Sequence, residues 1–381
     1  MQPKIIPLAR SARDVQRFLQ AAYPIYEGDP RWVAPLLMDQ RQVFLDGNPF
    51  FAHAQMQLWL AEQQGRVVGR IAGIYDRNYV EFQRDPAAFW GFFECVNDPE
   101  VSRALFDTVF AWARQQGAQR ILGPMNPSTN DECGLLVQGF DRPPVFMMTY
   151  NPPYYPQLVE QAGFTKAKDL LAFFFDLANT PMERFERIAS KFEKREPEMR
   201  LRPIRKKTLA EDIRKVTEVY NEAWEANWGF VPMTPEEIQF MAKRLKPLLY
   251  EGLAYLMETP DETVGFLLAS PDYNEAFLPL RGRLLSTGLI KALPYLLHWK
   301  TTDIVRVITL GVKKKFRGRG VEAAMLCHGL RTGFRAGFRH VEASWVLEDN
   351  EAVKRVIELF GGQVYKVYRV YERNLEPSPL P

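Results

Sequence analysis

The chain has 381 residues, of which 46% are hydrophobic and 25% charged, an ordinary composition for a globular protein of about two to three domains. Its net charge of +3 is too small to indicate, by itself, a nucleic acid or an acidic membrane as a partner. Three scattered cysteines exclude a disulfide framework, and four histidines without ligand spacing give no sign of a metal site. The sequence shows neither a signal-peptide pattern nor a membrane-spanning apolar run, so we expect a cytoplasmic protein.

The first half of the chain alternates predicted strands and helices. Strands are expected over 88–93 and 120–124, on either side of a helix that begins near Val101 and ends before Gly117. A further helix begins at Tyr155 and ends in a Gly-Phe pair. This alternation predicts an α/β domain built on a mixed sheet.

A polar loop over 123–134 interrupts this first half. It is dense in Asn, Ser, Thr and acidic residues, and Asn126, Asn130 and Glu132 are candidates for binding a polar substrate. The alternative is a solvated loop whose Asn and Asp side chains cap its own turns. Loops on a rigid scaffold often carry binding residues, so both interpretations stay open.

The second half follows a predicted linker over 179–198, which begins at a proline and becomes rich in charge. A strand is expected over 199–204, and helices over 208–222 and 234–249. Trp228 lies in an aromatic segment between these helices. It is a candidate substrate-binding residue, and the alternative is an ordinary core residue.

An unusual leucine-rich segment over 277–299 separates a strand at 264–269 from the next strand, which begins near Ile304. The segment contains several cations and is too short and too charged to span a bilayer. Three interpretations fit it: a helix that packs against the other domain, a lip for an acyl chain, and an interfacial membrane contact.

The most informative motif is a basic, glycine-rich loop between the strand at 304–310 and a helix that begins at Val321. Gly318 and Gly320 let the backbone approach a ligand closely, because they lack a Cβ. The start of the helix offers unpaired N–H groups and the positive end of its dipole. Five cations add formal charge: Lys313, Lys314, Lys315, Arg317 and Arg319. This combination predicts a binding site for a phosphate group.

Three kinds of phosphate loop compete for this motif. A Walker A loop is excluded because no Gly-Lys-Ser/Thr ending is present. Gly318-x-Gly320-x-x-Ala323 fits a loose dinucleotide fingerprint, with Glu342 downstream, but a basic stretch intervenes and too little chain follows for such a domain. The stretch 315–320 resembles the pyrophosphate loop of the GNAT N-acyltransferase superfamily, whose motif is Gln/Arg-x-x-Gly-x-Gly/Ala. We therefore favour this third resemblance, which covers roughly 199–374.

The resemblance implies an acyl-CoA donor, either acetyl-CoA or a longer acyl-CoA, without a metal. The pantetheine arm would run along the strand at 304–312, where Gly311 would permit a bulge, and a backbone N–H near Val312 would polarise the thioester. The residues implied to bind CoA are Leu310, Gly311, Val312, Lys313, Lys315, Phe316, Arg317, Gly318, Arg319, Gly320, Val321 and Asn350.

The catalytic residues are less clearly marked. The helix at 350–361 resembles the corresponding GNAT helix, but Ile357 stands where many members have the tyrosine that protonates the leaving thiolate. An acceptor amine is mostly protonated near neutrality, so a base must free its lone pair. Glu342 and Glu348 are the candidate bases, and the alternative is that Glu342 is a surface residue. The candidate acids are water or a tyrosine of the next strand, namely Tyr365, Tyr368 or Tyr371.

An internal repeat suggests that the first half is a second GNAT-like domain. Displacing the chain by 220 residues places 101–104 on 321–324 and Gly117 on Gly337, although helix–strand units also repeat by chance. The phosphate loop then falls on 95–100, which has no glycine and has two carboxylates that would repel a diphosphate. We therefore predict a degenerate domain over 1–178, the linker, and a catalytic domain over 199–381 with the single CoA site.

The sequence thus predicts an α/β protein of two GNAT-like domains that transfers an acyl group, by default acetyl, from acyl-CoA to a primary amine. One alternative is a long-chain acyl-CoA transferase acting on a lipid amine, as in ceramide formation. The other is a non-catalytic acyl-CoA-binding protein, which would release no free CoA. No nucleic-acid partner is expected, and 277–299 is the candidate for a peripheral membrane contact on the inner face.

Overall fold

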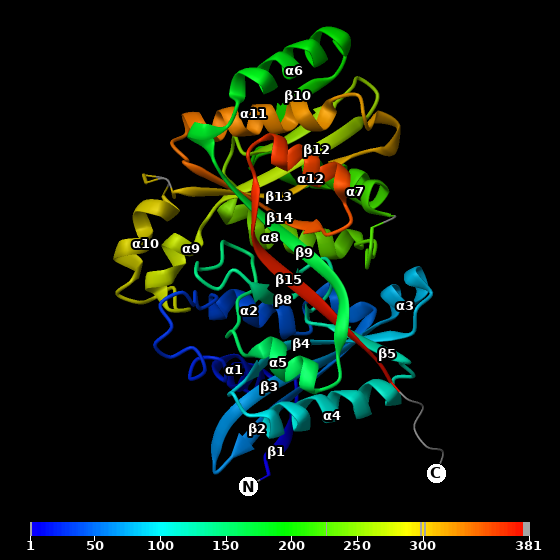
Figure 1. The fold of residues 1–381 in the computed structure, drawn as a ribbon, viewed down its shortest axis with the longest axis vertical. Helices are drawn as coiled ribbons and strands as arrows, with labels where there is room; N and C mark the ends of the chain where they lie inside the picture. The colour runs from blue at the N-terminus through cyan, green and yellow to red at the C-terminus, as the bar shows by residue number, and fades with distance from the viewer. Residues whose placement is uncertain (1, 226, 298, 301, 376–381) are drawn as a thin grey trace.

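The computed structural model describes residues 2–375, apart from 226, 298 and 301. One mixed sheet runs the length of this part of the chain, and helices cover its faces (Figure 1). The strands follow one another in the order β1-β2-β3-β4-β5-β15-β9-β14-β13-β12-β11-β10, and the short β8 (Leu135–Gln138) pairs with β15. A separate hairpin joins β6 (Met125–Asn126) and β7 (Glu132–Cys133).

The first half of the chain forms one end of this sheet. Its strands are β1 (Lys4–Leu8), β2 (Ala54–Gln63), β3 (Arg66–Asp76), β4 (Ala87–Cys95) and β5 (Arg120–Gly123). Its helices are α1 (Ala12–Gln20), α2 (Leu37–Phe44), α3 (Arg77–Gln83), α4 (Pro99–Gln115) and α5 (Tyr155–Gln161). Only β4 and β5 run parallel, because α4 crosses between them. One apolar core lies beneath α4 and α5, and another beneath α1 and α2.

The second half repeats this order at the other end. Its strands are β10 (Arg200–Pro203), β11 (Ala254–Glu258), β12 (Thr263–Pro271), β13 (Ile304–Val312) and β14 (His340–Leu347). Its helices are α7 (Leu209–Trp224), α8 (Pro235–Leu245), α11 (Val321–Arg335) and α12 (Glu351–Leu359). Here β13 and β14 are the parallel pair. Residues 179–198 contain α6 (Met182–Arg195), which lies along α11 (Figure 1).

The two halves exchange their last strands. The first half ends in β9 (Thr165–Asp176), which pairs with β14 of the second half. The second half ends in β15 (Gln363–Asn374), which pairs with β5 of the first half. Strands β9 and β15 also pair with each other along nearly their whole lengths, so they cross the centre of the molecule together (Figure 1). Each half is therefore completed by a strand from the other.

In both halves the parallel strands pair only at their starts and then diverge. Strand β13 pairs with β14 as far as Val307, and β4 pairs with β5 as far as Phe89. Each of these strands also contains a bulge, at Ile308 in β13 and at Phe92 in β4, where the register with the preceding strand shifts. Both halves thus contain the same open angle between two parallel strands.

Polar contacts fix helix α8 of the second half against the first half. Arg244 of α8 makes two hydrogen bonds to the Asp39 carboxylate, at 2.7 and 2.9 Å. His53 lies between Asp76 and Glu237, at 2.8 and 3.2 Å. These contacts join groups from opposite halves across a partly buried surface, so the halves pack as one unit.

The leucine-rich segment contains the last residue of α9 (Asn274–Phe277) and all of α10 (Leu289–Leu296), and the two helices project from one side of the molecule (Figure 1). Their inner face packs on residues of the first half, including Val33, Leu36 and Phe146. Packing against the other half is therefore confirmed for that face. Among the described residues, no helix has the length and apolar character that crossing a membrane requires.

The strand exchange predicts that neither half is stable alone. A fragment of residues 1–178 retains β9 but loses β14 and β15, so both edges of β9 and one edge of β5 have no partner. We expect this fragment to aggregate or to unfold without cooperativity, and to form a soluble 1:1 complex when co-expressed with residues 179–381. Size-exclusion chromatography and thermal unfolding of both preparations check this. A monomeric 1–178 fragment with a single sharp unfolding transition would contradict it.

Candidate active site

The glycine-rich loop forms a tight turn at the end of β13. Residues Lys314–Phe316 make one 3₁₀ turn, and Gly318 and Gly320 have φ of 73° and 95°. These backbone angles are unfavourable for residues with a Cβ. A Cβ on Gly318 would meet no atom within 4 Å, so the backbone there faces open space. A ligand can therefore approach the main chain at this glycine.

Helix α11 begins at this loop without a side-chain cap. Its N-cap residue is Gly320, so no side chain accepts a hydrogen bond from the N–H groups of its first turn. In the first half, by contrast, the Asp98 carboxylate caps α4 and accepts a hydrogen bond of 2.9 Å from the Glu100 N–H. The first half thus supplies its own anion at this place, and the second half leaves the place to an anion from outside.

Acidic side chains from distant parts of the chain pair with most of the loop cations. Lys313 is buried and contacts Glu218 of α7 at 2.5 Å and Glu262 at 3.1 Å. Lys315 also pairs with Glu262, and Arg319 pairs with Glu196 at the end of α6. The Lys315 and Arg319 pairs are partly exposed, so each is worth about 1 kcal/mol or less and can give way to a phosphate.

Two further arginines shape the loop. Arg317 donates hydrogen bonds to the carbonyls of Val312 and Ala223, at 3.0 and 2.6 Å, which joins the loop to α7. Arg195 of α6 donates to the Arg319 carbonyl and lies next to Gly320. Arg317 therefore has a structural contact, whereas the exposed Arg195 adds positive charge beside the start of α11.

The angle between the parallel strands is filled in the first half and open in the second. The register places Cys95 opposite Gly69, as Val312 lies opposite Gly265, so β4 and β13 occupy equivalent places. Residues 89–93 of β4 are all buried, whereas residues 307–310 of β13 are all partly exposed. Among the described residues, this strand is therefore accessible from outside in the second half and covered in the first.

Two tyrosines close the angle in the first half. The Tyr155 hydroxyl accepts a hydrogen bond of 2.8 Å from the N–H of Cys95, and the Tyr154 hydroxyl donates one of 2.8 Å to its carbonyl. The buried rings of Phe93 and Phe106 pack around Tyr155. The backbone position equivalent to Val312 is thus already occupied in the first half.

A buried ion pair lies at the base of the open angle. Arg306 of β13 faces Glu342 of β14 with 3.5 Å between Nε and the carboxylate, and both side chains are at most 3% exposed. The equivalent pair in the first half is Phe89 and Leu122, both apolar and buried. The fold does not require charge at this place, so the ion pair of the second half calls for another explanation.

Several buried polar atoms around this pair have no hydrogen-bond partner among the described residues. Six of the twelve such atoms in the described residues come from five neighbouring side chains of β13, β14 and β15: Arg306, Glu342, Trp345, Tyr365 and Tyr368. Trp345 lies under the Arg306 guanidinium and edge-on to Tyr368, which connects the group. Buried polar groups are normally satisfied, so this cluster is suited to water or to a polar ligand.

The electrostatics of the cluster favour proton transfer near neutral pH. Burial raises the pKa of Glu342 to about 7, although the Arg306 cation opposes the shift. Burial lowers the pKa of Lys366 to about 8, and its Nζ donates to the carbonyls of Gly139 and Arg142. Burial, with Glu342 next, raises the pKa of Tyr365, so this phenol retains its proton. A carboxyl group and a phenol suited to base and acid therefore lie side by side.

The candidate acceptor residues do not all lie together. Asn126 accepts a hydrogen bond of 2.6 Å from the Phe92 N–H and supports the bulge of β4. Asn130 bonds to Tyr220 and to the Val231 carbonyl, at 2.8 and 3.0 Å, so it joins the two halves. Burial raises the pKa of Glu132, and the nearby Arg306 cation opposes this shift. Of these three, Glu132 is the one that approaches the ion pair.

Trp228 lines a different cavity of about 580 Å³, between the loop after α7 and the first half. Its other lining residues include Tyr79, Arg84 and Arg120. Nearby, the loop is fixed by Thr129, which donates a hydrogen bond of 2.7 Å to the Gly229 carbonyl. Trp228 therefore lies at the junction of the halves.

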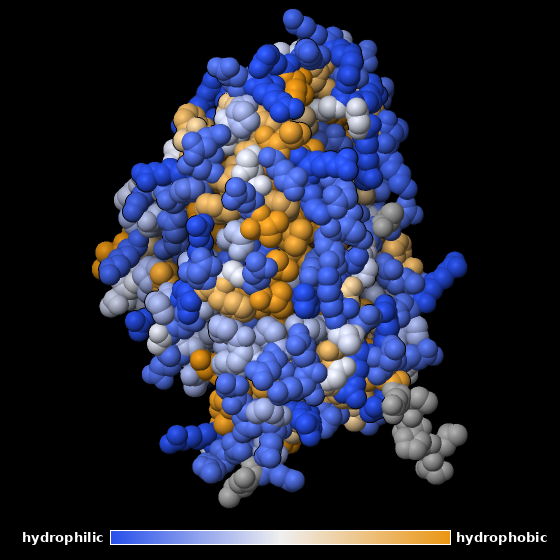
Figure 2. All heavy atoms as spheres, viewed as in Figure 1, coloured by the Kyte–Doolittle hydropathy of each residue, from blue (hydrophilic) through white to orange (hydrophobic). Residues whose placement is uncertain are grey.

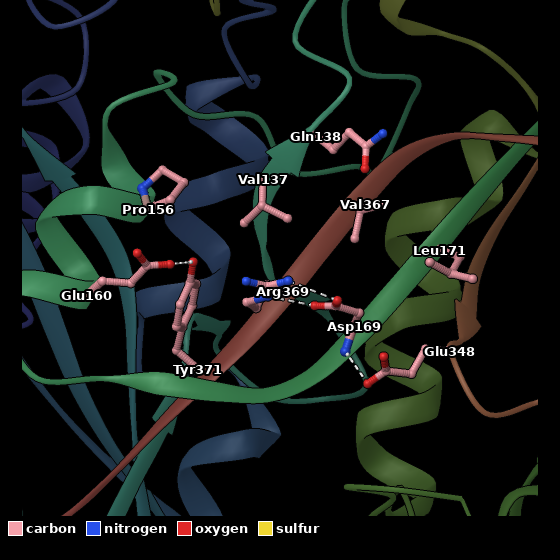
Figure 3. Close-up of a pocket in the computed structure, with 10 residues that line it drawn as sticks. All are labelled: Val137, Gln138, Pro156, Glu160, Asp169, Leu171, Glu348, Val367, Arg369 and Tyr371. Carbon is pink, nitrogen blue, oxygen red and sulfur yellow. Dashed lines mark hydrogen bonds and ion pairs between the residues drawn. The ribbon is translucent and has the colours of Figure 1, made fainter.

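Glu348 faces a shallow pocket of about 380 Å³ over the crossing of β9 and β15 (Figure 3). Its carboxylate accepts a hydrogen bond of 3.1 Å from the Asp169 N–H and pairs with Lys166 at 2.6 Å. Arg369 makes two hydrogen bonds to the Asp169 side chain in the same pocket. Glu348 is thus in an ordinary network of ion pairs, and Glu342 is the candidate base whose environment is unusual.

Tyr371 also lines this pocket, where its hydroxyl bonds to Glu160, so Tyr365 and Tyr368 are the two tyrosines near Glu342. Ile357 is buried in the core beneath α12 and offers no hydroxyl. Asn350 accepts a hydrogen bond from the Val353 N–H and caps α12.

The prediction that Gly311 permits a bulge in β13 is wrong. The bulge of β13 lies at Ile308, and Gly311 stays in register with Phe266. A Cβ on Gly311 would lie 2.3 Å from the Trp224 ring, so the glycine makes room for this indole beside the open angle. Sequence reasoning missed Arg306, Trp224 and Arg195; for Arg306, a lone charge inside an apolar strand was the available signal.

Comparisons with known proteins agree with this architecture. No protein-family model matches the chain. Bacterial ceramide synthase of Caulobacter vibrioides is 36% identical to this chain over an alignment of 381 positions, which covers 97% of each chain. Protein YghO of Escherichia coli is 33% identical over 369 residues, 95% of this chain and 93% of that one.

Two solved structures share the fold. A tandem GNAT protein from the clavulanic acid biosynthesis pathway matches with a TM-score of 0.59 and 13% identity, over 99% of this chain and all of that one. A GCN5-related N-acetyltransferase from Sphaerobacter thermophilus matches with a TM-score of 0.52 and 16% identity, over 100% and 98% of the two chains. The predicted mixed α/β fold with two GNAT-like halves is confirmed.

The buried ion pair predicts a pH-dependent loss of stability in Arg306→Met. Removing the cation leaves Glu342 buried without compensation, which costs about 3–5 kcal/mol when the carboxyl is ionised. Folded Glu342 binds its proton up to about pH 7, and the unfolded group only up to 4.5, so stability falls as pH rises through this window. Without Arg306 the pKa of folded Glu342 rises further, so the free energy of unfolding continues to fall at higher pH. The loss of stability relative to the wild type should therefore be larger at about pH 8 than at about pH 5. Urea unfolding measures both values.

The matched control is the double variant Arg306→Met with Glu342→Gln. It loses the same contacts of Arg306 with the carbonyls of Phe146 and Met147 but has no carboxyl to ionise. Measured against Glu342→Gln alone, its stability deficit should not change between the two pH values. A deficit in the single variant that is equally independent of pH would contradict the argument.

Proposed function

We propose that the second half of this chain, which belongs to the family of the bacterial ceramide synthase of Caulobacter vibrioides, transfers a long-chain acyl group from acyl-CoA to the amine of a lipid. The chain is an acyl-CoA-dependent N-acyltransferase of the tandem GNAT type. The acyl length, the acceptor and the residue roles below are the proposal.

One observation carries the location of the donor site: the same strand is buried in one half and open in the other. Residues 307–310 of β13 are partly exposed, whereas residues 89–93 of β4 are covered by packed aromatics. The uncapped start of α11 lies at the end of this open strand, and the capped start of α4 at the end of the filled one. This supports one CoA site per chain, in the second half.

The residues present fit a diphosphate followed by an extended arm. The backbone N–H groups from Gly318 to Val321 and the cations Lys314 and Arg195 would hold the diphosphate of CoA. The open edge of β13 would hold the pantetheine arm, and the backbone N–H at or near Val312 would polarise the thioester carbonyl. Bound acyl-CoA supplies the activated acyl group, and the protein supplies position and proton transfer.

Glu342 and a tyrosine of β15 would move the protons. Glu342 takes a proton from the protonated acceptor amine, which frees the lone pair that attacks the thioester carbon. Glu342 releases that proton to solvent through water. As the C–N bond forms and the C–S bond breaks, the attacking nitrogen loses a second proton to Glu342, and Tyr365, which retains its own proton, donates it to the departing sulfur. Arg306 holds Glu342 in place and stabilises its ionised form. Tyr365 then recovers its proton from Glu342 directly or through water.

A lipid acceptor is supported by two observations. The relative at 36% identity is named for the synthesis of ceramide, whose amide joins a long acyl chain to a long-chain amine. The leucine-rich insertion has exposed apolar side chains, and the core beneath it contacts Phe146, whose carbonyl accepts a hydrogen bond from Arg306. Transfer of acetyl to a small polar amine and binding without catalysis are the rival functions.

Turnover distinguishes these functions. Free thiol release should be fast with palmitoyl-CoA and a long-chain amino alcohol, and at least about tenfold slower with acetyl-CoA or with a short amine. Faster turnover with acetyl-CoA would replace the lipid proposal by the small-amine one. Ligand-induced stabilisation by acyl-CoA with no thiol release for any amine would identify a binding protein.

Substitution of the loop glycine should abolish donor binding. Gly318→Glu adds a carboxylate where the diphosphate is expected, so the Kd for CoA should rise more than about tenfold. Gly337→Glu is the matched control, because Gly337 also has positive φ, 96°, and open space around its Cβ position. Both variants should lose similar thermal stability, and only the first should lose the CoA-induced shift. Equal CoA shifts in the two variants, or a shift with NADH alone, would contradict the loop assignment.

The pKa of Glu342 sets the expected pH profile. The base must be ionised to accept a proton, so kcat/KM should rise as pH increases through about 7 and then level off. Glu342→Gln should lower kcat/KM by about 10²–10⁴-fold and remove this rise, whereas Glu342→Asp should preserve the rise at reduced rate. A Gln variant with the wild-type profile would transfer the role of base to another group, with Glu348→Gln as the next variant.

A further inference from the structure

The insertion over 278–299 exposes an unusual amount of apolar surface. Seven of the thirteen large apolar side chains that are exposed in the described residues lie in it: Leu278, Leu284, Leu285, Ile290, Leu293, Leu297 and Trp299. Three of these, Leu285, Ile290 and Trp299, are the most exposed of all, at 91, 80 and 76%. Figure 2 shows apolar atoms at the outer edge of the molecule where α10 lies. Exposed apolar side chains concentrated in one short segment indicate an interaction site.

Internal packing does not account for these side chains. The helices α9 and α10 already have a core of their own, in which Ala276, Phe277, Leu280 and Ala292 are buried against the first half. The exposed residues belong to the opposite face of the same segment and to the turn that joins the two helices. The insertion therefore packs on the first half through one face and exposes apolar side chains on the other.

The charge of the insertion has one sign. No acidic residue occurs between Ala276 and Thr302, whereas Arg281, Arg283, Lys291 and Lys300 are all exposed. None of these four cations forms an ion pair with an acidic side chain in the described part of the chain. A protein interface of two like copies would bring these cations together, whereas an anionic surface would attract all four.

We propose that this insertion docks the protein on the surface of a bilayer that contains anionic lipids. The exposed leucines and isoleucine enter the boundary between headgroups and acyl chains, and the cations contact the lipid phosphates. Trp299, with an apolar ring and one N–H donor, suits the same boundary. The protein then lies on the membrane without spanning it.

Docking would bring the active site to lipid substrates. Tyr273 and Phe277, which directly precede the insertion, pack against Phe146, and the Phe146 carbonyl accepts a hydrogen bond of 2.6 Å from Arg306. Phe146 thus contacts both the core that anchors the insertion and the buried ion pair. This last link rests on the proposed function, whereas docking itself rests only on exposed surface and charge.

Vesicle flotation tests the docking. We expect the full chain to float with vesicles of equal parts phosphatidylcholine and phosphatidylglycerol, about tenfold less with phosphatidylcholine alone, and less in high salt. Leu285→Ser with Ile290→Ser and Trp299→Ala should abolish flotation, and Arg283→Glu with Lys291→Glu should reduce it on anionic vesicles only. Met38→Ser with Phe334→Ser, which removes exposed apolar side chains at 66 and 57% on other helices, should float like the wild type.

The outcomes separate docking from its rivals. Failure of the wild type to float, or equal flotation of the triple variant, overturns the proposal. A wild-type dimer in analytical ultracentrifugation that the triple variant dissolves, without flotation, would instead make this surface an interface between copies and also overturn it. Thermal midpoints equal to that of the wild type confirm that the variants are folded. Because flotation needs neither acyl-CoA nor turnover, its failure is distinguishable from failure of the proposed function.

Discussion

The pairing of β9 with β15 is the constraint on which the rest of this structure depends. Strand β9 is the last strand of the first half and pairs with β14 of the second, whereas β15 is the last strand of the second half and pairs with β5 of the first. The sheet is therefore continuous from β1 to β10. Without that pairing, β9 and β15 would each expose an unpaired edge, and the sheet would divide into two. The exchange also fixes the loop of the first half over the parallel strands of the second, where the carbonyls of Phe146 and Met147 accept hydrogen bonds from Arg306. The candidate active site is therefore built from both halves.

The two halves use one frame for different purposes. In the first, aromatic side chains and the Tyr155 hydroxyl fill the angle between β4 and β5, and Asp98 caps the following helix. In the second, the corresponding angle is open, Gly320 leaves the helix uncapped, and a charged pair replaces two apolar residues. The filled half contributes stability because aromatic side chains pack closely in its angle. The open half keeps unpaired polar groups, which is a cost that a binding site explains.

Much of the fold and part of the site could be predicted from local patterns. The strands and helices around 304–335 and 340–359 lie where periodicity placed them, and the helix after Asn350 begins as expected. The loop residues Gly318 and Gly320 adopt the positive φ that their glycines allow. The candidate acceptor residues could not be tested in this way. The side chains of Asn126 and Asn130 make hydrogen bonds with Phe92, Tyr220 and Val231, and no local sequence pattern encodes these contacts.

The sequence by itself determined the phosphate-loop motif, because strand, cations, glycines and helix start are contiguous between 304 and 321 and act through backbone geometry. It also determined the cationic and apolar character of the insertion at 277–299. Only the tertiary structure decided which cations of the loop are already paired, since Glu196, Glu218 and Glu262 come from elements far along the chain. It also decided that Arg306 and Glu342 are buried face to face, and that β9 and β15 change places. Burial and pairing across such separations arise only when the chain closes on itself, so no single stretch of sequence contains them.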